Sequence, residues 1–183
     1  MARDKASFLF AVLISELRLD NLTKTDDVLL ALGKTFAAYM KSVSPFQYKN
    51  KTYRLINNYV ASPYARCDVC GNHPIIEVSV IRSEDGQKMR VGNDCIDRIT
   101  NRRVSRWFKN YRRIRESVIR NRKYIDGLSL ILDAYESNEL AFQMIDCDVE
   151  KLSLVLEKMV DGLNPDRREE QIVECYISRI AEA

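Results

Sequence analysis

The sequence predicts an α+β protein that is mostly α-helical, with a small β-hairpin embedded between N-terminal helices and a C-terminal helical bundle. Apolar residues recur at spacings of three and four through both ends of the chain, as they do in amphipathic helices. Residues 75–91 instead alternate apolar and polar residues around Asp85-Gly86, a pattern typical of a hairpin. Three cysteines flank that hairpin.

Two helices are expected before residue 45. Residues 6–19 and residues 26–43 both carry apolar residues near helical spacing. Thr25 is a suitable N-cap for the second helix, and Ser44-Pro45 should end it, because the residue before proline disfavours helical geometry. The apolar run in the first segment resembles the core of a signal peptide, but it is short and charged residues follow at once. We therefore expect a buried helix there and no membrane-spanning segment.

The middle of the chain is expected to hold a short strand, the hairpin and one long helix. The strand is expected around Tyr53–Ile56 and the hairpin over Ile75–Val91. Asn93 or Asp94 can then cap a helix that runs over residues 95–124.

This long helix is predicted to be both amphipathic and strongly basic. Its pattern permits a bend near Thr100-Asn101, and Asp126-Gly127 interrupts it. Residues 98–123 hold 11 Lys/Arg and one acid, whereas residues 124–183 carry a net charge of −9. The apolar stripe of the helix comprises Val104, Trp107, Phe108, Tyr111, Ile114 and Val118.

The remaining chain predicts only helices. They are expected over residues 128–136, 139–145, 148–161 and 166–181. Asp148 can cap the third of these, and Pro165 suits the first turn of the last. The chain would then divide into residues 1–45, 46–124 and 125–183, which could also form a single domain.

The cysteines predict a metal site rather than a disulfide framework. Five cysteines are present, an odd number, which favours reduced thiols and a cytoplasmic or other intracellular, reducing compartment. Cys67 and Cys70 are three residues apart and can wrap one ion from a tight turn. The hairpin would return the chain to that turn at Cys95, in the first turn of the basic helix, where the helix dipole stabilises a thiolate. We therefore expect a structural Zn²⁺.

The fourth ligand is open at the level of sequence. His73, the only histidine, lies three residues beyond Cys70 and is the preferred candidate. An acid such as Asp94 or Asp97, another cysteine (Cys147 or Cys175), or no fourth protein ligand are the alternatives. The thiols could also be plain buried cysteines, with His73 capping a turn.

A cysteine turn, a hairpin and a helix with a ligand at its start resemble a treble-clef zinc finger. The resemblance covers about residues 64–110. It implies a zinc-bound module in which two ligands usually come from the helix start. This chain departs from that pattern, because neither Gly92 nor Arg98, three residues on either side of Cys95, can bind zinc.

The basic helix predicts contact with nucleic-acid phosphates, with little base specificity. The side chains expected to supply most of the affinity lie off the apolar stripe: Arg102, Arg103, Arg106, Lys109, Arg113 and Arg120. DNA and RNA are not distinguished. Two alternatives concern the same helix: its aromatic residues could stack on unpaired bases instead of packing in the core, and its charges could be neutralised by the acidic C-terminal helices.

The second expected function is a protein-interaction adaptor or regulator of a larger nucleic-acid-processing complex. An enzyme is not expected, because the chain has no Walker loop, no H-E-x-x-H and no G-x-S-x-G motif. No small-molecule substrate is evident from the sequence either.

Overall fold

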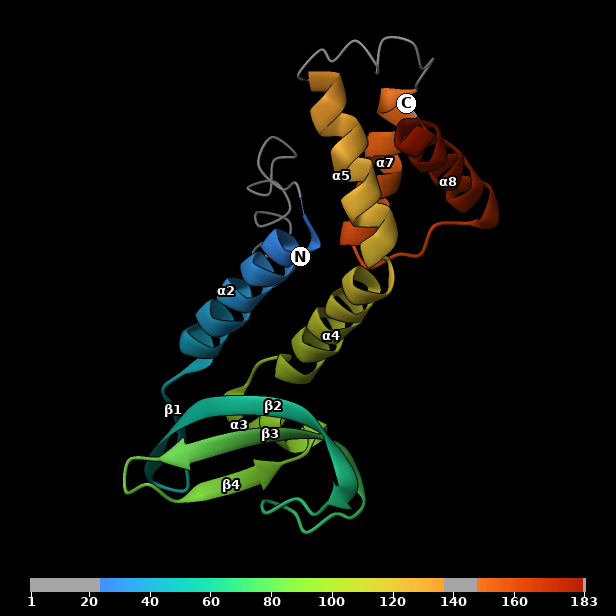
Figure 1. Cartoon of the computed structure of the whole chain (residues 1–183). Helices are drawn as coiled ribbons and strands as arrows, with labels where there is room; N and C mark the ends of the chain where they lie inside the picture. Colours follow the sequence, from blue (N-terminus) through green and yellow to red (C-terminus); the bar gives the residue numbers. More distant parts are fainter. Residues whose placement is uncertain (1–23, 137–147, 183) are drawn as a thin grey trace, which may run out of the picture. The chain divides into compact units, whose positions relative to one another are not determined.

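The computed structural model of the protein describes residues 24–136 and 148–182 (Figure 1). The predicted helices at 6–19 and 139–145 lie outside these residues. The described chain forms six helices and one four-stranded antiparallel sheet, which confirms the α+β, mostly helical class. It divides into two compact units. We call residues 33–111 the sheet unit, and residues 24–32, 112–136 and 148–182 the helical unit. No helix in the described ranges is long and apolar enough to cross a bilayer.

The sheet unit is built around four consecutive antiparallel strands, so the β part is larger than the predicted hairpin. The strands pair in chain order: β1 (Phe46–Tyr48), β2 (Lys51–Ala65), β3 (Ile75–Ser83) and β4 (Lys88–Val91) (Figure 1). The predicted hairpin is β3–β4. Gly86 adopts the left-handed conformation in its turn, at φ 88°, which suits the residue that closes such a loop.

Strand β2 is far longer than the four residues predicted for it. Its pairing with β3 shifts between Leu55 and Asn57 and again between Val60 and Ala65. Pro63 lies in the second irregularity, where proline is tolerated because the ladder needs no N–H donor there. These interruptions break the alternation that sequence reasoning uses, so the strand was not visible from its pattern.

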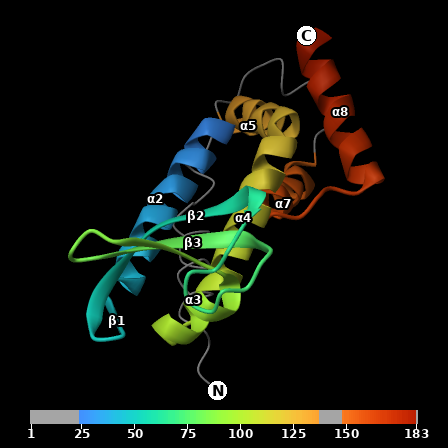
Figure 2. The same ribbon diagram turned by 90° about the horizontal axis from the view of Figure 1, so that it is seen from below.

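One face of the sheet packs against α3 (Asn93–Thr100), which contacts β1 and β3 and lies beside the strands in Figure 2. Tyr53, Leu55 and Ile81 lie on this face and are buried. Ile96 of α3 is fully buried as well. Apolar burial on this side therefore holds the start of α3 to the sheet.

The predicted single helix over 95–124 is wrong, because the chain forms three helices there. They are α3, α4 (Val104–Arg120) and α5 (Arg122–Glu136). Asn101 ends α3 in the left-handed conformation, at φ 51°. The N–H of Asn101 and that of Arg102 donate to the carbonyls of Arg98 and Asp97, respectively, as in a Schellman cap. Asparagine tolerates this conformation better than other non-glycine residues, so the bend expected at Thr100-Asn101 is a true break.

The aromatic residues of α4 belong to the core of the sheet unit, which confirms the packing interpretation for Trp107 and Phe108. These two side chains are 3% and 1% exposed. Trp107 stacks on Tyr39 of α2 (Thr25–Val43), with 3.8 Å between ring centroids and 5° between planes. Phe36 packs beside both residues of α4. Stacking with bases is therefore not available to Trp107 in this fold.

The helical unit combines the second half of α4 with α5, α7 (Val149–Val160) and α8 (Arg167–Glu182), and α5 contacts both α7 and α8. Asp148 caps α7 as predicted, accepting the N–H of Lys151 at 3.1 Å. The helix predicted over 166–181 is α8, which begins one residue later, so Pro165 precedes its first turn. Asp166 accepts the N–H of Glu169 at 2.9 Å and donates its own N–H to the Glu169 carboxylate at 2.6 Å, which forms a capping box.

The predicted interruption at Asp126-Gly127 is also wrong, since both residues lie inside α5. A Cβ on Gly127 would lie 2.3 Å from Cδ1 of Ile177 on α8. This glycine therefore serves the close packing of α5 on α8 rather than ending a helix.

Candidate metal centre

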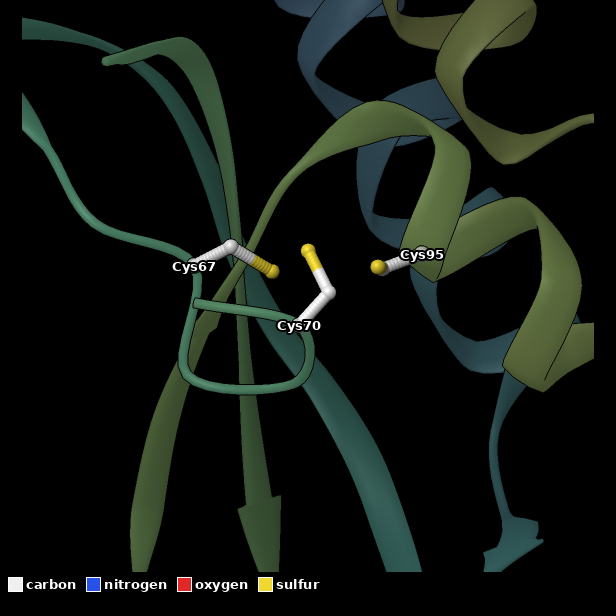
Figure 3. A group of neighbouring side chains, drawn as sticks. All are labelled: Cys67, Cys70 and Cys95. Carbon is white, nitrogen blue, oxygen red and sulfur yellow. The ribbon is translucent and has the colours of Figure 1, made fainter. Parts of the chain in front are cut away.

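The three cysteines that were predicted to bind a metal lie together. The Sγ atoms of Cys67, Cys70 and Cys95 are all within 4.8 Å of one another. Figure 3 shows Cys67 and Cys70 reaching from one tight turn and Cys95 reaching toward them from α3. Cys67 and Cys95 are buried and Cys70 is exposed. The cluster therefore combines two buried cysteines with one exposed cysteine.

The turn that carries Cys67 and Cys70 is set by backbone hydrogen bonds. The N–H of Gly71 donates to the carbonyl of Cys67 at 2.8 Å, and the N–H of Cys67 donates to the carbonyl of Asn72 at 2.9 Å. Gly71 has a φ of 77°, which only glycine adopts without strain. This glycine lets the chain reverse directly after Cys70, so both sulfurs face the same point.

The turn is also tied to the end of β4, which delivers Cys95. Asp68 donates its N–H to the carbonyl of Arg90 at 2.8 Å, and its carboxylate accepts the N–H of Arg90 at 2.6 Å. The N–H of Gly92 points at Sγ of Cys67 at 3.5 Å. The third sulfur is thus brought close by ordinary hydrogen bonds between the cysteine turn and the returning strand.

The N-cap of α3 differs from the prediction that Asn93 or Asp94 would fill this position. Gly92 occupies it, with extended backbone and no side-chain cap. Asn93 instead donates its amide to the carboxylate of Glu77 at 2.6 Å. A Cβ on Gly92 would lie 3.2 Å from Cγ2 of Ile75, so this glycine gives the strand end the room to approach β3.

The thiols influence one another strongly. Burial alone would raise the pKa of Cys67, but N–H groups of Gly92, Cys70 and Val69 favour its thiolate and hold that pKa below its ordinary value. Burial and the neighbouring sulfurs of Cys70 and Cys67 raise the pKa of Cys95 to about 12. Three thiolates this close repel one another unless a cation lies between them.

This donor set fits a metal ion. Sulfurs that bind one tetrahedral zinc at about 2.3 Å lie about 3.8 Å apart, so the observed group would need to contract by about 1 Å or less. Soft thiolate ligands also select soft or borderline metals over Mg²⁺ or Ca²⁺. The buried cluster is therefore a candidate metal centre with three protein ligands.

His73, the predicted fourth ligand, is exposed and does not belong to the cluster. It lies in the segment between the cysteine turn and β3. Among the alternatives, the Asp97 carboxylate is occupied, because it accepts both the N–H and the hydroxyl of Ser105. Cys175 is exposed on α8 in the helical unit, and Cys147 lies outside the described residues. The structure thus brings together three of the four predicted ligands, Cys67, Cys70 and Cys95, but not His73.

The six basic residues predicted to contact phosphate fall in both units. In the sheet unit, Arg103, Arg106 and Lys109 are exposed and form no ion pair with any described residue. Arg102 donates to the carbonyl of Ser42 at 3.0 Å. Arg102 and Arg103 lie in the link before α4, and Arg106 and Lys109 lie in its first two turns. Cys95 is the member of the sulfur cluster that lies in the preceding helix, α3.

In the helical unit the basic residues form hydrogen bonds and ion pairs with other residues of the chain. Arg113 donates to the carbonyl of Asp161 at 3.5 Å, and Arg120 donates to the Asn164 side chain at 3.4 Å. Their neighbours Arg122 and Lys123 form ion pairs: Arg122 with Asp26 at 3.0 Å and Asp126 at 3.5 Å, and Lys123 with Glu174 at 3.4 Å. Acidic residues thus neutralise Arg122 and Lys123.

Sequence reasoning named Asp97 only as a possible zinc ligand and missed that it joins α3 to α4. It also missed the exposed basic residues Arg54, Arg82 and Lys88 on the sheet. The signal for Asp97 was present, since an acid eight residues before Ser105 can reach it once the helix breaks. No sequence signal marked the sheet residues, because their proximity depends on strand register.

Comparisons of the chain with models of protein families, with curated proteins and with solved structures found no match.

Proposed function

We propose that this chain is a zinc-stabilised nucleic-acid-binding protein, in which the basic residues at the start of α4 contact phosphate. The observation that carries the proposal is the sulfur cluster, since its third member lies in the helix directly before Arg103, Arg106 and Lys109. An ion bound by Cys67, Cys70 and Cys95 would fix the start of α3, and through Asp97 the start of α4.

Zinc is the metal we assign to this site. Three thiolates from a tight turn and a helix start are typical of structural zinc, which takes sulfur and imidazole ligands in tetrahedral geometry. His73 would complete a Cys3His set if its segment closed over the cluster. This arrangement resembles a treble clef with one ligand, rather than two, taken from the helix.

The exposed charges at the start of α4 suit a polyanion. Arg103 directly precedes α4 and Lys109 lies in its second turn, six residues further on. At 1.5 Å per residue they are separated by about 9 Å along the helix axis, a length that can reach more than one phosphate. No acid among the described residues pairs with them. Such contacts depend on charge and not on base identity, so we expect weak sequence preference.

A gel-shift series in rising salt tests the phosphate contacts. The variant Arg106→Gln/Lys109→Gln removes two charges from α4, and Arg167→Gln/Arg168→Gln removes two exposed charges from α8 as a matched control. The slope of log affinity against log salt should fall by about 2 for the α4 variant with duplex DNA, and should stay unchanged for the control. Equal slopes for wild type and both variants would count against contact through α4.

Native mass spectrometry tests the metal. The purified protein should carry one zinc per chain, and the variant Cys67→Ser/Cys95→Ser should carry none.

The alternative function, a protein-interaction adaptor, predicts a different result. Nucleic-acid affinity that does not change with salt, together with a protein partner that stays bound after nuclease treatment, would support it.

A further inference from the structure

The sheet carries a row of basic side chains that runs directly across three strands. Arg54 on β2 is paired with Arg82 on β3, and Arg82 is paired with Lys88 on β4. Residues directly opposite one another in antiparallel strands project from the same face. Neighbouring strands lie about 4.8 Å apart, so the three charges occupy a row about 10 Å long.

This row lies on the side of the sheet opposite to the face that packs against α3. Further along the same side, Val78 is fully buried in a small apolar cluster with Ala61 and Ala65, so the row occupies the exposed end of this face. Arg54, Arg82 and Lys88 are exposed, whereas the alternating residues Tyr53 and Ile81 are buried. One pair further along, Val80 is opposite Arg90, which is exposed on the same face as Lys88. We call Arg54, Arg82, Lys88 and Arg90 the basic sheet face.

The arrangement costs stability in the free protein. Like charges placed directly opposite one another on a sheet repel. Within the described ranges, no acid forms an ion pair with Arg54, Arg82 or Lys88, and Arg90 has only Asp68 at 3.9 Å. The nearby Lys51 is different, because Asp85 pairs with it at 2.6 Å. An external anion would relieve the repulsion.

An exposed aromatic ring continues the same face. Tyr59 is opposite Val78, two pairs beyond the Arg54–Arg82 pair on that side of the sheet. Its side chain is 37% exposed. At about 3.4 Å per residue along a strand, Tyr59 lies about 14 Å from the basic row, a distance of two to three nucleotides. Along the strand direction, Arg90 on β4 is level with the midpoint of this distance, because it is opposite Val80.

We infer that the basic sheet face binds single-stranded nucleic acid, with phosphates on Arg54, Arg82 and Lys88 and a base stacked on Tyr59. This inference rests on the proposed function and adds a second surface to it. A ring beside a cationic row can stack only on a base that is not enclosed in a duplex, and such stacking tolerates any base. A single strand is therefore the preferred partner of this face.

Fluorescence anisotropy with a labelled 15-nucleotide oligothymidine and with a labelled duplex of mixed sequence tests the inference. The variant Arg82→Gln/Lys88→Gln should bind the single strand about twentyfold more weakly at 0.1 M salt, with a salt slope reduced by about 1.4, because each lost contact removes about 0.7 from that slope. Tyr59→Leu should weaken binding of the single strand, and Tyr59→Phe should restore it. Arg167→Gln/Arg168→Gln serves again as the charge-matched control.

The melting temperature of each variant separates binding from folding. Arg82→Gln/Lys88→Gln should be at least as stable as the wild type, because it removes repulsion. Unchanged affinity of this variant for the single strand would overturn the inference, as would an equal loss of affinity for the duplex. If the wild type binds neither probe in a salt-dependent manner, the proposed function itself fails. If only the α4 variant loses affinity, the function stands and the sheet surface does not.

Discussion

The carboxylate of Asp126 accepts the backbone N–H of Thr25 at 2.7 Å, across 101 residues of sequence. Thr25 was predicted to cap α2, but it is the first helical residue, and α5 supplies the acceptor for its amide. The first amides of a helix have no partner within the helix, and a negative charge beside them is favourable. Asp126 thus joins α2 to α5 within the helical unit.

Replacing Asp126 with alanine should lower the free energy of unfolding by about 1–2 kcal/mol at neutral pH. Burial alone would raise the pKa of Asp126, but the hydrogen bonds from Thr25 and the charge of Arg122 hold it below its ordinary value. The stabilisation is therefore present above the ordinary aspartate pKa and is lost as pH falls through the lower, folded value. In urea denaturation, the difference in unfolding free energy between the wild type and Asp126→Ala should be smaller at pH 2.5 than at pH 7. Asp133→Ala, exposed on the same helix, should have little effect at either pH.

Gly162→Ala should destabilise the helical unit by about 1–3 kcal/mol. Gly162 has a φ of 81°, and a Cβ there would lie 2.9 Å from Cα of Ile114. Neither the backbone conformation nor the space suits a side chain. Gly33→Ala is the opposite case, because a Cβ on Gly33, within α2, meets nothing within 4 Å. That variant should gain about 0.5–1 kcal/mol. Equal effects in thermal denaturation would contradict the steric account.

Chelation of the metal should destabilise the wild type, and Cys70→Ser should abolish that response. Cys70 is exposed, so its replacement costs little packing, and any loss of stability reports the lost ligand. At a metal concentration a thousandfold above Kd, binding contributes about 4 kcal/mol to the unfolding free energy. Cys175→Ser, also exposed and outside the cluster, should behave as the wild type does. Identical chelator responses of the two variants would exclude Cys70 as a ligand.

Asp97→Ala should cost about 1–2 kcal/mol of stability in the sheet unit. The carboxylate accepts the N–H of Ser105 at 2.8 Å and its hydroxyl at 2.5 Å, so both bonds are lost. Ser105→Ala removes only the second bond and should cost less. A double-mutant cycle between the two positions should give a clear coupling energy, and additive effects would show that the contact is not formed in solution.

Much of this structure followed from local patterns. The helix of α2, the hairpin and the grouping of the three cysteines were predicted because each depends on residues close in sequence or on one tight turn. The basic row from Arg54 to Lys88 could not be predicted, because it depends on the register of three strands, and β2 lacks a regular alternation. The start of α2 depends on Asp126, which no local rule connects to Thr25.

The left-handed conformation of Asn101 also affects how the directions of the basic side chains on α4 can be predicted from the sequence. In an unbroken helix each residue is rotated about 100° from the one before it, so Cys95 would define the direction of every later arginine. The break at Asn101 means that the rotation of α4 about its own axis no longer follows from that of α3. The contact between Asp97 and Ser105 sets this rotation instead. A helical wheel drawn from Cys95 through Lys109 therefore places the side chains of α4 on the wrong face of the helix. A wheel that begins at Val104 places them correctly.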